Sequence, residues 1–328
     1  MKDIQISILD QMATPTGKSA EDVARDTIAQ VKYAEQLGFK RYWFAEHHGT
    51  SGLSSSSPEV MMAVSASLTE TIHVGSGGIL LPQYSPLKVA TQLLQLESLF
   101  PGRIDGGVGR SPGGVERVRR ALANDKEPQL QTYPQKLDTL TRYVQGKDVD
   151  GVYATPRTVT APSIFSLGLG ENSAQLAAHH GVGYVYGHFI SPDRGKAAHW
   201  TYRASFRSMY MAEPKALTAV FVICGADDEH AETLALSQDV WLLRTEKGLN
   251  THIPSLEEAR AVPLSSRDHQ KIKQNRGRMI IGGPEKVKDS LLLLAEEHQV
   301  DELMVLTNIY DEKEKQASYT RLAELFLS

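Results

Sequence analysis

The sequence contains a single cysteine, Cys224, among its 328 residues. One thiol cannot form an intrachain disulfide, and a lone cysteine suits a reducing compartment. No apolar run approaches the roughly 18 residues of a membrane-spanning helix. The first ten residues, MKDIQISILD, include two acids and lack the pattern of a signal peptide. We therefore expect a cytoplasmic protein without a membrane partner.

An excess of charge is also missing. The formal net charge is −4, which gives no general attraction to nucleic acid. The hydrophobic share of 41% and the charged share of 23% are ordinary for a globular chain, whose core needs no disulfide or structural metal. No linker or low-complexity tract divides the sequence, so we expect one domain over residues 1–328.

Apolar runs alternate with amphipathic segments along the chain. The first helix is predicted between Ser19, with Asp22 in the capping-box position, and Gly38. Each predicted helix follows a strand, which indicates parallel pairing. The eight predicted strands cover residues 4–9, 41–45, 72–81, 103–109, 163–170, 183–189, 216–224 and 302–308.

Eight such units are what an α/β fold of the (β/α)8 TIM-barrel type requires, and we predict this fold. The segment 247–278 is long, polar and rich in Lys and Arg. It interrupts the repeat, and we expect a long excursion there or a lid over the site.

Glu46, His47 and His48 follow the second predicted strand, where a barrel places its chemistry. Side chains alternate along a strand, so only one of the two histidines can face a given pocket. The pair is either structural or includes one general acid or base. We expect no metal site, because the spacing does not match a helical His-Glu-x-x-His motif and no other cluster supplies further ligands.

Glycines interrupt the third predicted strand at Gly75-Ser76-Gly77-Gly78. Glycine within a strand marks either a bulge or the close approach of a ligand to the backbone. Arg110 follows the fourth strand and suits a phosphate or carboxylate, although such a residue can also be a surface ion-pair partner. Residues 168–173, GLGENS, open a helix whose first N–H groups can hold a phosphate. Together these features fit a planar, phosphorylated cofactor with His47 over its reactive ring.

Six segments resemble one known family. They are SILD, RYWFAEHH, SSSPEV, HVGSGGILLPQYSPLKVA, PGRIDGGVGR and SAQLAAHHG. In this order and spacing they are similar to the bacterial luciferase-like flavin monooxygenases, and specifically to their single-chain oxidoreductase branch, over nearly the whole chain. The resemblance implies a (β/α)8 barrel, usually a homodimer, that uses reduced FMN and molecular oxygen, or the deazaflavin F420 in some branches.

The resemblance also assigns roles by position. It makes His47 the catalytic histidine and Glu46 its acidic neighbour, and it places Ser76, Gly77 and Gly78 under the flavin ring, with a non-prolyl cis peptide between the two glycines. The cofactor phosphate and its surroundings are assigned to Arg110, Pro112, Gly113, Gly170, Glu171 and Ser173.

The chain departs from the family pattern at two places. The phosphate turn reads LGLGENS, where relatives often carry two serines, so Leu169 and Gly170 offer only backbone contacts. After Arg110 the chain reads SPGG, without the Thr-Asp pair that is frequent there.

These features predict a two-component monooxygenase that receives FMNH2 from a separate flavin reductase and acts on a small organic substrate with O2. The open alternatives are an F420- or NAD(P)H-dependent flavin oxidoreductase on the same barrel and a non-catalytic flavin-binding protein. Substrate identity is not encoded in a readable motif; carbon-rich pocket candidates are Leu53, Tyr84 and Phe189.

Overall fold

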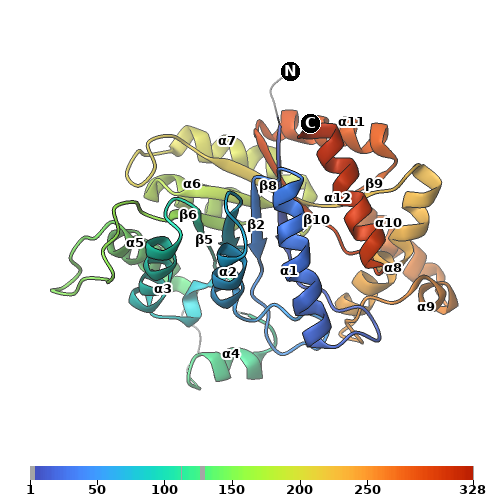
Figure 1. The fold of residues 1–328 in the computed structure, drawn as a ribbon, viewed down its shortest axis with the longest axis horizontal. Helices are drawn as coiled ribbons and strands as arrows, with labels where there is room; N and C mark the ends of the chain where they lie inside the picture. Colours follow the sequence, from blue (N-terminus) through green and yellow to red (C-terminus); the bar gives the residue numbers. More distant parts are fainter. Residues whose placement is uncertain (1–3, 112, 126–129, 328) are drawn as a thin grey trace.

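The computed structural model describes residues 4–111, 113–125 and 130–327. Eight parallel strands form a closed barrel (Figure 1). The last of them pairs with the first and with its predecessor, which closes the sheet and confirms the predicted (β/α)8 fold. The barrel strands are β1 (Gln5–Asp10), β2 (Arg41–Phe44), β3 (His73–Ser76), β5 (Ile104–Gly109), β6 (Ser163–Gly168), β7 (Gly183–Gly187), β8 (Ala216–Cys224) and β10 (Glu302–Leu306).

Two short strands refine the prediction. The third predicted strand is divided by a cis peptide between Gly77 and Gly78, and its second part, β4 (Ile79–Leu80), pairs with β5. A strand not predicted from the sequence, β9 (Met279–Gly282), pairs with the last four residues of β8. Phe221 of β8 pairs with both β9 and β10, so these two strands lie on opposite sides of β8.

Helices cover the outside of the barrel (Figure 1). Each member of this ring contacts the next, and the last contacts the first: α1 (Ala20–Gln36), α2 (Pro58–Ser67), α3 (Pro86–Leu99), α5 (Tyr133–Val144), α6 (Glu171–His180), α7 (Gly195–Ser205), α11 (Pro284–His298) and α12 (Glu312–Phe326). The helix α8 (Asp228–Glu246) instead packs against β9 and against the segment that follows it. Ser19 and Asp22 form the predicted capping box of α1. The less regular segment after β5 contains α4 (Glu116–Leu122) and α5 (Tyr133–Val144). None of the helices in the described part of the chain is long and apolar enough to cross a membrane.

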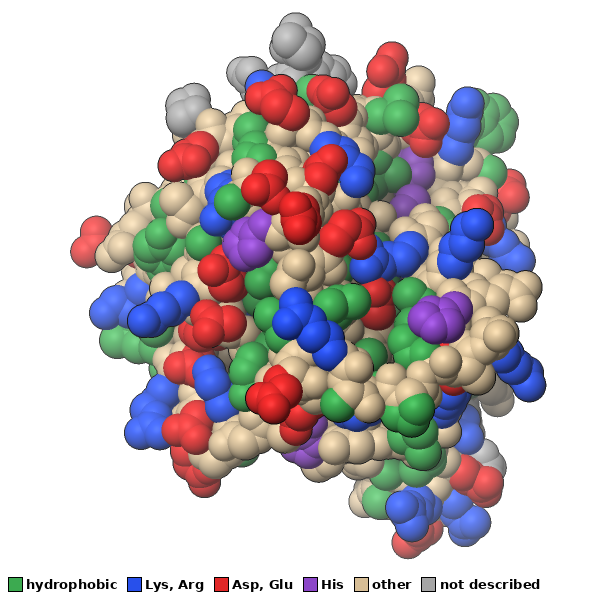
Figure 2. Space-filling view, turned by 90° about the vertical axis from the view of Figure 1, so that its right-hand side faces the viewer, with side chains coloured by type: hydrophobic (Ala, Val, Ile, Leu, Met, Phe, Trp, Pro, Cys, Tyr) green, Lys and Arg blue, Asp and Glu red, His purple; other side chains and the backbone are tan. Residues whose placement is uncertain are grey.

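The predicted excursion at 247–278 contains α9 (Leu256–Ala261) and α10 (Ser266–Arg276). Its basic residues make ion pairs: Lys247 contacts Asp268 at 2.5 Å, and Arg276 forms two bonds of 2.7 Å with Asp239. Figure 2 faces the side on which Figure 1 shows α8, α9 and α10, and side chains of both charges are interspersed over it. The Lys and Arg residues of this segment therefore do not form a patch of one sign.

Alternation along β2 separates the interior of the barrel from the layer between strands and helices. Tyr42 and Phe44 pack outward against the helices, while Trp43 and Ala45 join the apolar cluster inside the barrel. Arg41 begins the same inward series at the amino-terminal end. Its guanidinium, with a side chain only 1% exposed, bonds Asp105 at 2.6 Å and Glu302 at 2.7 Å. This network closes the floor of the barrel, which is the end that contributes stability in this fold.

Candidate active site

The candidate residues predicted from the sequence follow four strands that are consecutive neighbours in the barrel, in the order β2, β3, β5 and β6. Parallel strands end at the same edge of the barrel, so the segments after them lie side by side at its carboxyl end. The tertiary structure thus brings together residues that the sequence spreads over more than a hundred positions.

His47 continues the inward series of Trp43 and Ala45. Its backbone N–H donates to the carbonyl of Ser55 at 2.7 Å, which fixes the loop after β2. The Nδ1 atom is buried and has no hydrogen-bond partner among the residues described. Burial, aided by the neighbouring His48, lowers the pKa of His47 to about 4, so the ring is neutral near pH 7. A neutral imidazole with a free nitrogen can take up or release a proton.

Glu46 and His48 point the other way and contact one another. His48 Nε2 lies 2.8 Å from Oε1 of Glu46. The same carboxylate accepts hydrogen bonds from the N–H of Leu80, at 2.7 Å, and from the hydroxyl of Tyr84. Burial and the hydrogen bond to Glu46 raise the pKa of Tyr84. Both oxygens of Glu46 are therefore engaged, and the residue joins the end of β2 to the segment after Gly78.

Gly77 and Gly78 are packed closely against neighbouring strands: a Cβ on Gly77 would lie 2.4 Å from Cδ1 of Leu9. The N–H of Gly77 donates to the carbonyl of Phe44 at 2.7 Å, and Ser76 Oγ donates to the carbonyl of Gly107 at 2.8 Å. A Cβ on Gly107 would lie 2.0 Å from the carbonyl oxygen of Ser76, so only glycine permits this approach. The peptide between Gly77 and Gly78 is cis, as the resemblance implied.

Arg110 is exposed at the end of β5 and lies near the buried phenol of Tyr133. Gly113 is buried with a φ of +77°, and a Cβ there would lie 2.4 Å from Cδ1 of Leu80. It thereby packs the loop after Arg110 against β4. Pro112, the remaining candidate on this loop, lies outside the described residues.

The turn after β6 is built around Ser173. Its hydroxyl donates to the carbonyl of Gly170 at 2.7 Å, and a Cβ on Gly168 would lie 2.0 Å from that hydroxyl oxygen. Glu171 is exposed, and its carboxylate accepts a hydrogen bond from the hydroxyl of Thr201 at 3.3 Å. The group that Glu171 offers to the turn is therefore its backbone N–H. The first N–H groups of a helix lack intrahelical acceptors, which makes this turn suitable for an anion.

Sequence reasoning missed the partners that hold these groups in place. Ser55, which fixes the backbone of His47, stood in a run of four serines without a distinguishing signal. The sequence predicts Tyr84 only as a carbon-rich pocket residue, whereas its hydroxyl bonds Glu46. Among the described residues, no three His, Cys, Asp or Glu side chains are grouped so that they could hold a metal ion.

Comparison with known proteins shows the family of the chain. The luciferase-like monooxygenase family matches residues 4–302. The chain belongs to the luciferase-like monooxygenase family. It is 50% identical to the uncharacterized protein YceB of Bacillus subtilis, over 99% of this chain and all of that protein. It is 31% identical to the N-acetyl-S-alkylcysteine monooxygenase of Bacillus subtilis, over 99% of each chain. The crystal structure of apo-MsnO8 superposes with a TM-score of 0.92 at 32% identity, over 99% of this chain and 98% of that one.

Three loops of this member of the luciferase-like family meet around Gly52. The N–H of Thr14 donates to Gly52 at 2.9 Å, and the N–H of Ile253, in the predicted excursion, donates to Thr14 at 2.9 Å. A Cβ on Gly52 would lie 2.0 Å from the carbonyl oxygen of Thr251. The segment 251–253 therefore lies directly against the loop that carries His47.

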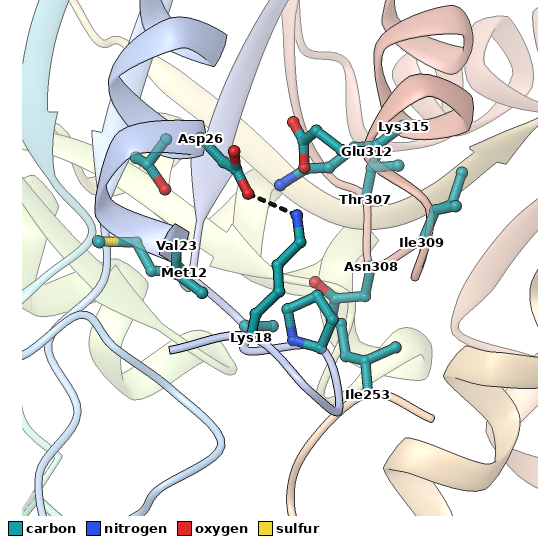
Figure 3. A pocket seen from close by; sticks show the side chains of 13 residues that line it. Met12, Lys18, Val23, Asp26, Ile253, Thr307, Asn308, Ile309, Glu312 and Lys315 are labelled. Carbon is teal, nitrogen blue, oxygen red and sulfur yellow. Dashed lines mark hydrogen bonds and ion pairs between the residues drawn. The ribbon is translucent and has the colours of Figure 1, made fainter. Parts of the chain in front are cut away.

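A second charged cluster in the luciferase-like barrel lies at the ends of β1 and β10 (Figure 3). Lys18 Nζ contacts Asp26 at 2.5 Å, and Lys315 Nζ lies 3.8 Å from Asp10. The cavity between these groups has a volume of about 20 Å³, which suits about one water molecule. It is far too small for a flavin, and the candidate active site remains at the ends of β2 to β6.

Proposed function

We propose that this protein is an FMN-dependent, two-component monooxygenase that uses FMNH2 and O2 on a small organic substrate. The observation that carries the proposal is the neutral, inward-facing ring of His47, whose Nδ1 is buried without a partner among the described residues. Family membership supports an oxidoreductase, and the free imidazole supports acid–base work.

The residues at the strand ends fit a flavin. Gly77 and Gly78 offer a backbone without side chains for a flat ring, and a Cβ on Gly78 would lie 2.9 Å from the carbonyl of Gly107. Arg110 and the turn from Gly170 to Ser173 offer a guanidinium and free N–H groups for a phosphate. When bound, reduced FMN supplies the electrons that activate O2.

The protein's own contribution is to position the reacting groups and to exclude water from them. His47 would hold or move a proton at the reacting centre, and Glu46 would act through the groups that it orders. The contacts of Thr14, Gly52 and Ile253 would shield the site from solvent at its rim. The apolar interior, including Leu53 and Phe189, would receive a carbon-rich substrate.

We further propose one domain, a cytoplasmic location and a separate flavin reductase as the source of FMNH2. The buried free thiol of Cys224 is consistent with a reducing compartment. A homodimer is supported by an apolar stripe along α2 and its C-cap residue, where Val60, Val64 and Leu68 recur every four residues and are 61%, 40% and 47% exposed. A second copy of the chain would cover this stripe.

The test begins with anaerobic titrations of FMNH2 and F420H2 into the purified protein. Reaction with ¹⁸O2 and a substrate panel follows, headed by S-alkyl thioethers because a relative is named for such a substrate. We expect FMNH2 binding and one labelled oxygen atom in the product. Exchanging His47 for Ala should lower product formation about 100-fold or more while FMNH2 affinity is largely kept. Selective F420H2 binding, or flavin binding without oxygenation of any substrate, would contradict the proposal.

A further inference from the structure

A groove lies on the outside of the barrel between α7 and α11, which are neighbours in the ring of helices. Its volume is about 900 Å³, far larger than the water-sized cavity at the ends of β1 and β10. The lining side chains of each helix recur three or four positions apart, so each helix turns one face toward the groove. These side chains include Asp193, Lys196 and Trp200 on α7 and the turn before it, and Leu293, Glu296 and Glu297 on α11.

Each of the two helices contributes a large, exposed apolar side chain to this groove. Trp200 on α7 is 68% exposed, and Leu293 on α11 is 57% exposed. A single exposed apolar residue needs no explanation, but here two of them border the same hollow. The packing beneath them is close, since a Cβ on Gly195 would lie 2.2 Å from the imidazole of His298. That imidazole is held in turn, because its Nδ1 lies 2.9 Å from the hydroxyl of Thr218.

The charges around the groove are predominantly negative. Four exposed carboxylates line it, and within the described part of the chain none of them forms an ion pair. They belong to Glu171, Asp193, Glu296 and Glu297. Among the described residues that line the groove, Lys196 is the one cation. His298 adds no positive charge near pH 7, because burial lowers its pKa to about 4.

This combination of groups selects the chemistry of an occupant. A partner with cations alone would leave Trp200 and Leu293 in water, and an apolar partner without charge would cover carboxylates that it cannot pair. A helix with apolar and basic side chains on one face satisfies both groups. We propose that the groove between α7 and α11 binds a basic amphipathic helix of a partner protein. An apolar side chain of that helix would lie between Trp200 and Leu293, and its Lys or Arg residues would pair with the carboxylates.

The position of the groove connects it with the candidate active site. Glu171 and Asp193 follow β6 and β7, at the carboxyl end of the barrel, so one end of the groove reaches the rim of the site. A bound partner would therefore lie beside the entrance. Trp200, Leu293 and Glu296 have no role in the candidate active site, so the inference is independent of the proposed flavin chemistry.

The probe for this groove is a fluorescein-labelled, amidated peptide of about 14 residues in which Leu and Arg recur with helical spacing. Fluorescence anisotropy should show that this Arg peptide binds the full-length protein. The affinity should fall as the salt concentration rises, because ions screen the attraction between the peptide and the carboxylates. A peptide with Glu in place of each Arg should bind about 10-fold more weakly or worse.

Substitutions in the groove test whether the Arg peptide binds there. Trp200→Ala should weaken binding about 10-fold or more, because a large aromatic side chain often supplies much of the binding energy of an interface. Replacing both Glu296 and Glu297 by Gln should also weaken binding and reduce its dependence on salt. Leu249→Ala is the control, because it removes an apolar side chain that is 59% exposed outside the groove. All of these positions are exposed, so the circular dichroism spectrum should not change.

Three results would overturn the proposal. They are the absence of binding, equal affinities for the Arg and Glu peptides, and equal binding by the wild-type protein and Trp200→Ala. A second copy of the chain is the other possible occupant. Sedimentation would then show a smaller species for Trp200→Ala than for the wild-type protein, and that result would also overturn the assignment to a basic helix. None of these measurements involves FMNH2, so a failure here leaves the proposed function unaffected.

Discussion

The backbone N–H of Leu80 donates a hydrogen bond to Oε2 of Glu46 at 2.7 Å. This bond joins the loop that carries His47 to the strand segment that follows Gly77 and Gly78. The other oxygen of Glu46 accepts from His48 and Tyr84. Glu46 thus sets the distance between the imidazole of His47 and the backbone of Gly77 and Gly78. Its role in the site is to position these two segments.

Glu46→Gln should therefore destabilise the fold. The glutamine amide cannot accept all three hydrogen bonds, and a buried donor without a partner costs about 1–3 kcal/mol. Urea unfolding should show a loss of this size. The control is Glu59→Gln, because burial raises the pKa of Glu59, so that its charge does not stabilise the fold; we expect a change below about 0.5 kcal/mol. Equal losses in both variants would refute a special role for Glu46.

His47 should make stability depend on pH. The pKa of His47 is about 4 in the fold and 6.5 in its unperturbed state, so the unfolded chain binds the extra proton first as pH falls. The contribution of His47 to the free energy of unfolding is fully present above pH 6.5 and is lost as pH falls from 6.5 to 4. The total loss is on the order of 3 kcal/mol. Unfolding free energies of wild type and His47→Gln should diverge in this window. Parallel curves would show that the ring is not desolvated in the fold.

Asp105 should be essential to the barrel floor. Burial opposes its charge, but the adjacent Arg41 holds the pKa of Asp105 at about 2. Asp105→Asn would leave the buried guanidinium short of a counter-charge, and we expect a loss of about 3–5 kcal/mol in unfolding free energy. Asp26→Asn serves as the comparison, since Asp26 forms a half-exposed pair with Lys18 and should cost no more than about 1 kcal/mol.

Val64 should lie in the dimer interface. Val64→Lys would place a charge in the apolar stripe of α2, and light scattering should show a monomer with an unchanged circular dichroism spectrum. Val159→Lys is the matched control, because Val159 is fully exposed and is not part of a helix. If the wild-type protein is itself a monomer, the apolar stripe does not mediate dimerisation.

Gly52 should control the rim of the site. In Gly52→Ala the new methyl group would meet the carbonyl oxygen of Thr251, and one of the two loops must move. We expect faster tryptic cleavage after Lys247, which precedes the displaced segment, and a smaller effect on FMNH2 binding. Ser51→Ala, at an exposed neighbouring position, should leave the cleavage rate unchanged.

The barrel and the strand ends that carry polar groups are predictable from the amino-acid sequence. The spacing of apolar residues distinguishes strands from helices within a short stretch of sequence. The capping box of α1 likewise involves residues only three positions apart. The same periodicity of two indicated that His47 and His48 face opposite ways. Local signals failed at β9, which has only four residues and follows a polar segment, and at Ser55, which looks like its neighbours.

Which distant groups meet depends on how the barrel packs. Glu46 bonds Leu80 and Tyr84 because barrel closure places consecutive βα loops side by side. The free Nδ1 and lowered pKa of His47 likewise arise from burial, which depends on everything packed around the ring. A residue's type and spacing determine what it can do, whereas its partners and its exposure to water determine which of those roles remains open.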